Sequence, residues 1–91
     1  MKNGDEEDVF KDILNQIKSK QLTKIRIAVC SLYGNFDFDT IEKKLLNIFL
    51  QEIMVLLNYY KENMAFKNDV KYFLIPKIQN SKFNIYYEEI S

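Results

Sequence analysis

Three carboxylates stand close together in the middle of the chain. Asp37, Asp39 and Glu42 precede a long apolar segment, and paired acids of this kind can hold Mg²⁺ or serve as general acid and base. The same spacing suits a helix start, where Asp39 and Glu42 form a capping box and Asp37 is a second capping candidate. We favour capping, because it uses the carboxylates to satisfy free backbone N–H groups. No metal site is therefore predicted here.

A glycine just before these acids raises the question of phosphate binding. Gly34 lies in the stretch SLYGNFDFDT, residues 31–40, between a predicted strand and a predicted helix. A phosphate site at such a junction needs several small residues that leave the N–H groups of the helix start uncovered. Here two carboxylates face those N–H groups and would repel an added anion. The stretch is therefore predicted to be a connector, in which Gly34 and Asn35 provide the turn.

The groups that most often carry catalysis are missing from the sequence. There is no histidine, which removes the commonest general base at neutral pH and histidine-based metal sites. Cys30 is the only cysteine, so an internal disulfide and a cysteine-based zinc site are excluded, and its thiol is expected to be buried. The glycine-rich nucleotide-binding motifs do not occur either. The sequence predicts a protein that is not an enzyme and carries no cofactor.

Length and hydropathy predict one small domain. The 91 residues should form a single domain over 1–91, with residues 1–4 frayed. At 47% hydrophobic residues the chain is too apolar to be disordered, yet no apolar run reaches the roughly 18 residues of a membrane span. The first ten residues are acidic and lack the apolar segment of a secretion signal, so a cytoplasmic location is expected.

The charge balance favours no class of partner. Thirteen basic and thirteen acidic residues give a net charge of zero, so nothing global attracts the chain to nucleic acid or to an anionic membrane. Lys, Ile and Asn are abundant, and Arg26 is the only arginine. This bias suggests an AT-rich genome and is compatible with a phage, viral or mobile-element origin, in which case the location would be the host cytoplasm.

Hydrophobic periodicity predicts five elements in the order α-β-α-β-β. Helices are expected over 5–20 and 40–64, and strands over 23–33, 70–78 and 82–90. The strand assignments depend on β-branched density and on the alternation of side chains between two faces. They predict an α+β fold, in which a small three-stranded mixed sheet packs on the long amphipathic helix and the N-terminal helix is a second one. The strand order is left open.

The long helix is more apolar than one sheet requires. A helix that packs on a sheet alone needs an apolar stripe of about 100°, whereas the apolar arc of residues 40–64 covers roughly half of the circumference. Ile48, Val55 and Tyr59 widen that arc on one side. The helix should therefore also contact helix 5–20, a second copy of the chain or another protein.

The sheet face turned away from this helix is the other candidate surface. Its predicted apolar centre includes Phe73, Ile75 and Tyr86. Helix 5–20 either covers this face or packs beside helix 40–64, and in the second case the exposed patch would mark an interaction site. The predicted partner or self-association surface combines both features: Ile48, Val55, Tyr59, Phe73, Ile75 and Tyr86.

Two functional hypotheses follow. The first is a small non-enzymatic interaction protein of the inhibitor, adaptor or immunity-like kind, which binds another protein and forms a homodimer; outward tyrosines and open strand edges support it. The alternative is nucleic-acid binding, in which aromatic side chains stack on bases and a cationic rim holds phosphates. That rim would consist of Lys24, Arg26, Lys71, Lys77 and Lys82. Neither hypothesis involves a membrane or a small-molecule cofactor.

Overall fold

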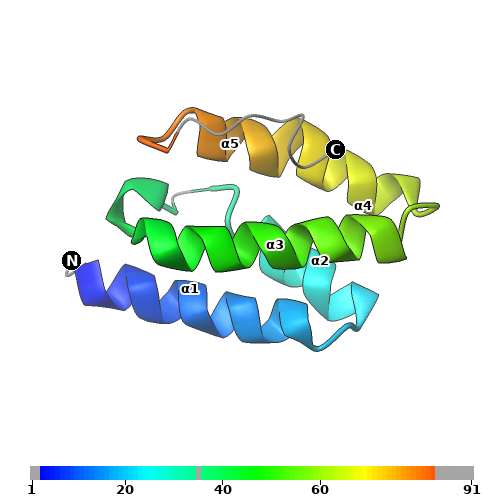
Figure 1. Ribbon diagram of the computed structural model, residues 1–91, viewed down its shortest axis with the longest axis horizontal. Coiled ribbons are helices and arrows are strands. Elements are labelled where there is room, and N and C mark those ends of the chain that lie inside the picture. The colour runs from blue at the N-terminus through cyan, green and yellow to red at the C-terminus, as the bar shows by residue number, and fades with distance from the viewer. Residues whose placement is uncertain (1–2, 35, 84–91) are drawn as a thin grey trace.

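Every regular element that the computed structural model describes is a helix (Figure 1). The structure describes residues 3–34 and 36–83, and in these ranges it contains no strand. The elements are α1 (Asn3–Lys18), α2 (Leu22–Cys30), the 3₁₀ helix η1 (Phe38–Thr40), α3 (Lys43–Tyr59), α4 (Met64–Asp69), the π-helix η2 (Val70–Leu74) and α5 (Ile75–Gln79). The predicted α+β fold with its three-stranded sheet is therefore wrong. None of the helices in these ranges combines the length and the apolar content that crossing a membrane requires.

The segment predicted as strand 23–33 is helix α2 with the turn that follows it. Its buried side chains are those of Ile25, Ala28, Val29 and Leu32. This spacing of three, four and seven residues is that of one helical face, whereas a strand would send Ala28 and Val29 to opposite sides. The β-branched residues favoured a strand, but burying all four apolar groups on one side outweighs that preference. Cys30, expected to be buried, is exposed as a result.

The segment predicted as strand 70–78 belongs to a helical run from α4 through η2 to α5. Its buried residues include a series with a spacing of four: Phe66, Val70, Leu74 and Ile78. In a regular α-helix each step of four residues overshoots a full turn by about 40°, so this series would drift off the core. In η2 the N–H of Ile75 donates to the carbonyl of Val70, which widens one turn and offsets the drift. Pro76, which has no N–H to donate, follows in the first turn of α5.

The third predicted strand, 82–90, lies mostly outside the described residues. Only Lys82 and Phe83 are described, and both lie in a turn.

The long helix predicted over 40–64 is shorter at both ends. At its start, the side chain of Asp37 accepts the N–H of Asp39 at 3.0 Å and so caps η1, while Glu42, at the start of α3, makes no side-chain capping bond. At its end, the side chain of Asn63 accepts the N–H of Phe66 at 2.9 Å. Asn63 thereby starts a new helix, α4, and the chain reverses between the two.

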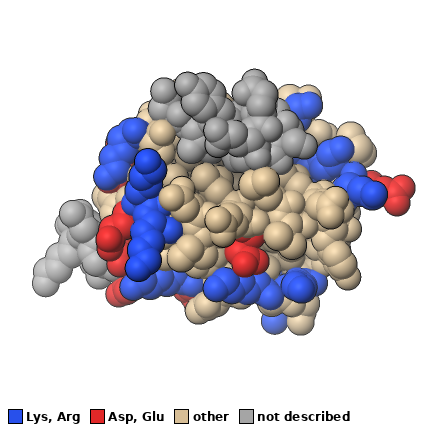
Figure 2. Space-filling view, in the orientation of Figure 1, with Lys and Arg blue, Asp and Glu red and all other residues tan. Residues whose placement is uncertain are grey.

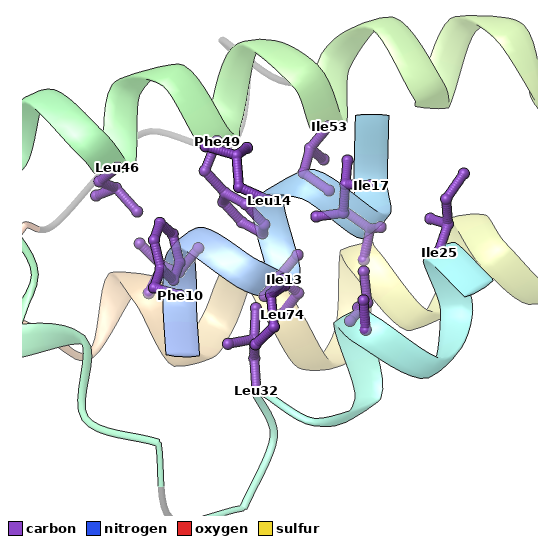
Figure 3. Close-up of a cluster of buried hydrophobic side chains, with 14 of the residues drawn as sticks. Phe10, Ile13, Leu14, Ile17, Ile25, Leu32, Leu46, Phe49, Ile53 and Leu74 are labelled. Atoms are coloured by element: carbon purple, nitrogen blue, oxygen red, sulfur yellow. The ribbon is translucent and has the colours of Figure 1, made fainter. Parts of the chain in front are cut away.

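The core forms where α1 and α3 run side by side, with α2 passing behind α3 (Figure 1). The ring centroid of Phe10 lies 5.0 Å from that of Phe49 on α3, and 5.8 and 6.0 Å from those of Phe36 and Phe38. Figure 3 shows labelled side chains from α1, α2, α3 and η2 turned toward one shared interior. Among the described residues no polar or charged side chain is buried, so burial of apolar groups is the main stabilising contribution.

Phe49→Ala removes the ring that joins α3 to Phe10. Because truncating a buried Phe costs about 3–5 kcal/mol, the free energy of unfolding should fall by that amount, as measured by urea denaturation followed by circular dichroism. Asn47→Ala, on the exposed side of the same helix, should change it by less than about 0.5 kcal/mol. Equal effects of the two substitutions would contradict the packing of α3 on α1.

Lys20 provides a second test of the fold. It lies between α1 and α2 with a φ of 61°, in the left-handed region that favours glycine, and its side chain is exposed. Lys20→Gly should therefore raise the free energy of unfolding by about 1 kcal/mol. Lys18→Gly, in the last turn of α1, should lower it by about 1 kcal/mol. If both substitutions lower the denaturation midpoint, the left-handed turn at Lys20 is not formed.

Candidate functional site

Helix α3 turns one apolar line toward solvent. Its inner side supplies four core residues: Leu46, Phe49, Ile53 and Leu56. On its outer side Ile48 is 37% exposed, Val55 is 55% exposed and Tyr59 is 69% exposed. Steps of seven and four residues align these side chains along the helix, and Glu52 lies among them, four residues after Ile48. We call Ile48, Glu52, Val55 and Tyr59 the α3 face.

The surface around α3 is largely uncharged on the side shown in Figure 2. There a broad area of uncharged side chains occupies the middle of the molecule, with Lys and Arg along its borders and acidic atoms within it. A groove of about 210 Å³ adjoins the α3 face at Ile48. Its lining residues come from α1, from the residue before α3 and from the first half of α3: Glu7, Lys11, Glu42, Lys44, Leu45 and Ile48. Two of its lining residues, Leu45 and Ile48, are apolar, and the other four carry charges of both signs.

The other residues of the predicted partner surface lie on other elements. Phe73 is 57% exposed on η2, where its ring lies 5.5 Å from that of Tyr33. Ile75 is 1% exposed and belongs to the core. Tyr86 lies outside the described residues. The sheet face that was to unite Phe73 and Ile75 is not formed, because both residues lie in helices.

The predicted cationic rim is distributed over several elements. Lys24 and Arg26 lie on α2, Lys71 on η2, Lys77 on α5, and Lys82 beyond it. The Arg26 guanidinium donates to the Asp69 carboxylate at 3.0 Å. The Lys77 ammonium donates to the carbonyl oxygens of Tyr33 and Gly34 at 3.0 and 2.7 Å. Arg26 and Lys77, two residues of the predicted rim, therefore bond within the fold.

These contacts join α2 and the turn after it to the C-terminal helices. We call Arg26, Tyr33, Asp69, Phe73 and Lys77 the α2–α4 seam. The hydroxyl of Tyr33 donates to the backbone carbonyl of Asp69 at 3.0 Å. Burial, and then the negative charge of Asp69, raise the pKa of the Tyr33 phenol above its usual value of about 10, and the positive charge of Arg26 opposes the shift. At neutral pH the phenol is thus held as a hydrogen-bond donor, which is a structural role.

The carboxylates that the sequence offered as metal ligands bond to the backbone. An oxygen of Asp37 accepts the N–H of Asp39, and an oxygen of Asp39 accepts the N–H of Lys82 at 2.7 Å. Glu42 stands on the rim of the groove. In residues 3–34 and 36–83 no group of three His, Cys, Asp or Glu side chains is placed to hold a metal ion.

Glu52 is the surface residue that sequence reasoning missed. It is half-buried, and it forms no ion pair or hydrogen bond with the described part of the chain. Its spacing of four from Ile48 and three from Val55 was the available signal, since such residues share a helical face.

Tyr33→Phe tests the α2–α4 seam through pH. Because the folded-state pKa of the phenol is raised, the stability that it contributes is complete below about pH 10 and is lost as the pH rises toward the folded-state value. Between about pH 9 and 12 the free energy of unfolding of the wild type should therefore fall more steeply than that of Tyr33→Phe. Tyr59→Phe, an exposed ring on α3, should keep the wild-type slope. If the free energy of unfolding falls equally steeply with pH for Tyr33→Phe and the wild type, the Tyr33 phenol is not buried as described.

No family model matches the chain, and no match was found among curated proteins or solved structures. Its function must therefore be inferred from the chemistry and geometry of its own residues.

Proposed function

We propose that the chain is a small non-enzymatic binding protein whose α3 face docks onto another protein. The observation that carries the proposal is the line formed by Ile48, Val55 and Tyr59 on the outer side of a helix whose inner side builds the core. When a partner covers apolar groups that otherwise stay in water, the free energy of the complex is lowered. Tyrosine is also enriched at protein interfaces.

The way α3 is held supports binding without rearrangement. Phe49 and Leu56 are buried on its inner side, so the backbone beneath the α3 face is fixed before a partner arrives. A pre-formed surface avoids the entropy cost of ordering on binding. The groove beside Ile48, lined in part by Leu45, adds a recess that can receive one side chain of the partner, and recesses commonly hold the anchor residues of an interface.

Inhibitor, adaptor and immunity-like roles all require such a surface, and either another protein or a second copy of the chain could cover it. We place this activity in the cytoplasm, because Cys30 is the only cysteine and is exposed, which suits a reducing compartment. The nucleic-acid alternative has less support, because Arg26 and Lys77 are engaged within the α2–α4 seam.

Val55→Asp tests this function by placing a charge in the middle of the α3 face. Immobilised wild type, Val55→Asp and the control Asn47→Asp would be incubated with lysate of the native host, and the retained proteins identified by mass spectrometry. Asn47 lies about 100° around the helix from Ile48 and therefore outside the α3 face. The substitution Asn47→Asp adds the same negative charge as Val55→Asp. Proteins retained by the wild type and by Asn47→Asp should be depleted about tenfold on Val55→Asp.

Light scattering of the same three proteins reports whether a second copy is the partner. If retention and molar mass are the same for all three, the α3 face does not bind protein and the proposal fails.

A further inference from the structure

We infer that the occupant of the α3 face is an amphipathic helix of another protein, which places a lysine or arginine against Glu52. This inference rests on the proposed function and adds the chemistry of the partner. It starts from one unpaired carboxylate inside an otherwise apolar line.

Glu52 is placed where a partner would exclude water. It lies four residues after Ile48 and three before Val55, is half-buried, and has no charged or hydrogen-bonding partner among the described residues. Glu7, which lines the groove, differs in this respect, since it pairs with Lys11 at 3.4 Å. An apolar partner would remove water from the Glu52 carboxylate without offering a hydrogen bond or a positive charge in its place, which is strongly unfavourable. A partner with a cation at this point gains a charge-assisted hydrogen bond instead.

A second copy of the chain does not meet this requirement. A symmetric dimer contact is formed by the same patch on both subunits. When two parallel α3 helices pair in register, Glu52 of one subunit faces Glu52 of the other. When they pair antiparallel about the middle of the line, between residues 53 and 54, the two Glu52 positions are only about 4.5 Å apart along the axis. Both arrangements bring two carboxylates together in a water-poor contact, so the face suits a different chain.

The shape of the face favours a helix over a strand. Ile48 and Tyr59 are eleven residues apart, which gives a straight ridge about 16 Å long. The backbone N–H and carbonyl groups along the middle of α3 are used within the helix, so an added strand would find no hydrogen-bond partners there. A helix satisfies its own backbone and can lie alongside α3 with matching periodicity.

The partner helix therefore carries a definable pattern. A bulky apolar residue would enter the groove beside Ile48, where it would contact Leu45 in the lining. Along the same face of the partner, the cation would stand about four residues from that anchor, and apolar residues about seven and eleven residues from it, opposite Val55 and Tyr59. The charged lining residues of the groove carry both signs, so Leu45 and Ile48 favour an apolar anchor and the charges favour no one sign.

Selection from a displayed library of helical peptides tests this pattern. Peptides with one variable face would be selected separately on the wild-type protein and on Glu52→Lys. Wild-type selections should enrich Lys or Arg four residues from a bulky apolar anchor, and Glu52→Lys selections should enrich Asp or Glu at the same position. One wild-type peptide, measured by fluorescence anisotropy, should bind Glu52→Lys about tenfold more weakly, and changing its cation to Glu should restore that binding. Asp8→Lys, an equal charge change at an exposed position of α1, should leave the affinity unchanged.

The outcomes separate this inference from the proposed function. If Val55→Asp abolishes peptide binding while Glu52→Lys has no effect, and no charge preference emerges, the α3 face binds protein but the role of Glu52 is wrong. If the peptides bind equally to wild type, Val55→Asp and Glu52→Lys, the proposed function itself fails. A wild-type dimer in solution that dissociates on Val55→Asp would also overturn the inference, because a second copy would then occupy the face.

Discussion

The contact between Phe10 and Phe49 determines how the rest of the molecule is arranged. It sets α1 against α3, and at the far end of the pair the hydroxyl of Tyr60 donates to the carbonyl of Lys20 at 2.8 Å. The two contacts are ten or eleven residues apart on each segment, so α1 and α3 run in the same direction and in register. With Phe49 of α3 buried against Phe10, Val55 and Tyr59 on another side of the same helix remain exposed. The α3 face is thus a consequence of the core.

The C-terminal helices must keep apolar side chains that recur every four residues, from Phe66 to Ile78, turned toward the core. The widened turn of η2 does this between Val70 and Ile75. The α2–α4 seam then holds this run against α2. Its ion pair between Arg26 and Asp69 is partly exposed, so the pair itself adds little stability compared with the buried ring of Phe66. The α2–α4 seam therefore contributes more to the position of the C-terminal helices against α2 than to the stability of the fold.

The sequence predicted the helices with long apolar periods and failed where the apolar runs were short. Helix 5–20 corresponds to α1, and helix 40–64 to α3, with errors at the ends because Asn63 and η1 start separate elements. In residues 23–33 and 70–78 β-branched density and alternation suggested strands, but tertiary packing decided for helices. Ile48, Val55 and Tyr59 were chosen from the width of one helical arc, a local property that does not depend on the sheet, and all three are exposed on α3. Phe73 and Ile75 were chosen from a sheet face that is not formed; Phe73 is nevertheless exposed, on η2, whereas Ile75 belongs to the core.

Methyl NMR tests most directly whether the outer side of α3 is the binding surface. Three isoleucines report on three environments: Ile48 on the α3 face, Ile27 exposed on α2, and Ile53 in the core. When a helical peptide selected on the wild-type protein is bound and its signals are saturated, the methyl groups of Ile48 and Val55 should lose the most intensity and those of Ile27 and Ile53 the least. Strong loss at Ile27 with Ile48 and Val55 unaffected would show that the binding surface lies elsewhere on the molecule.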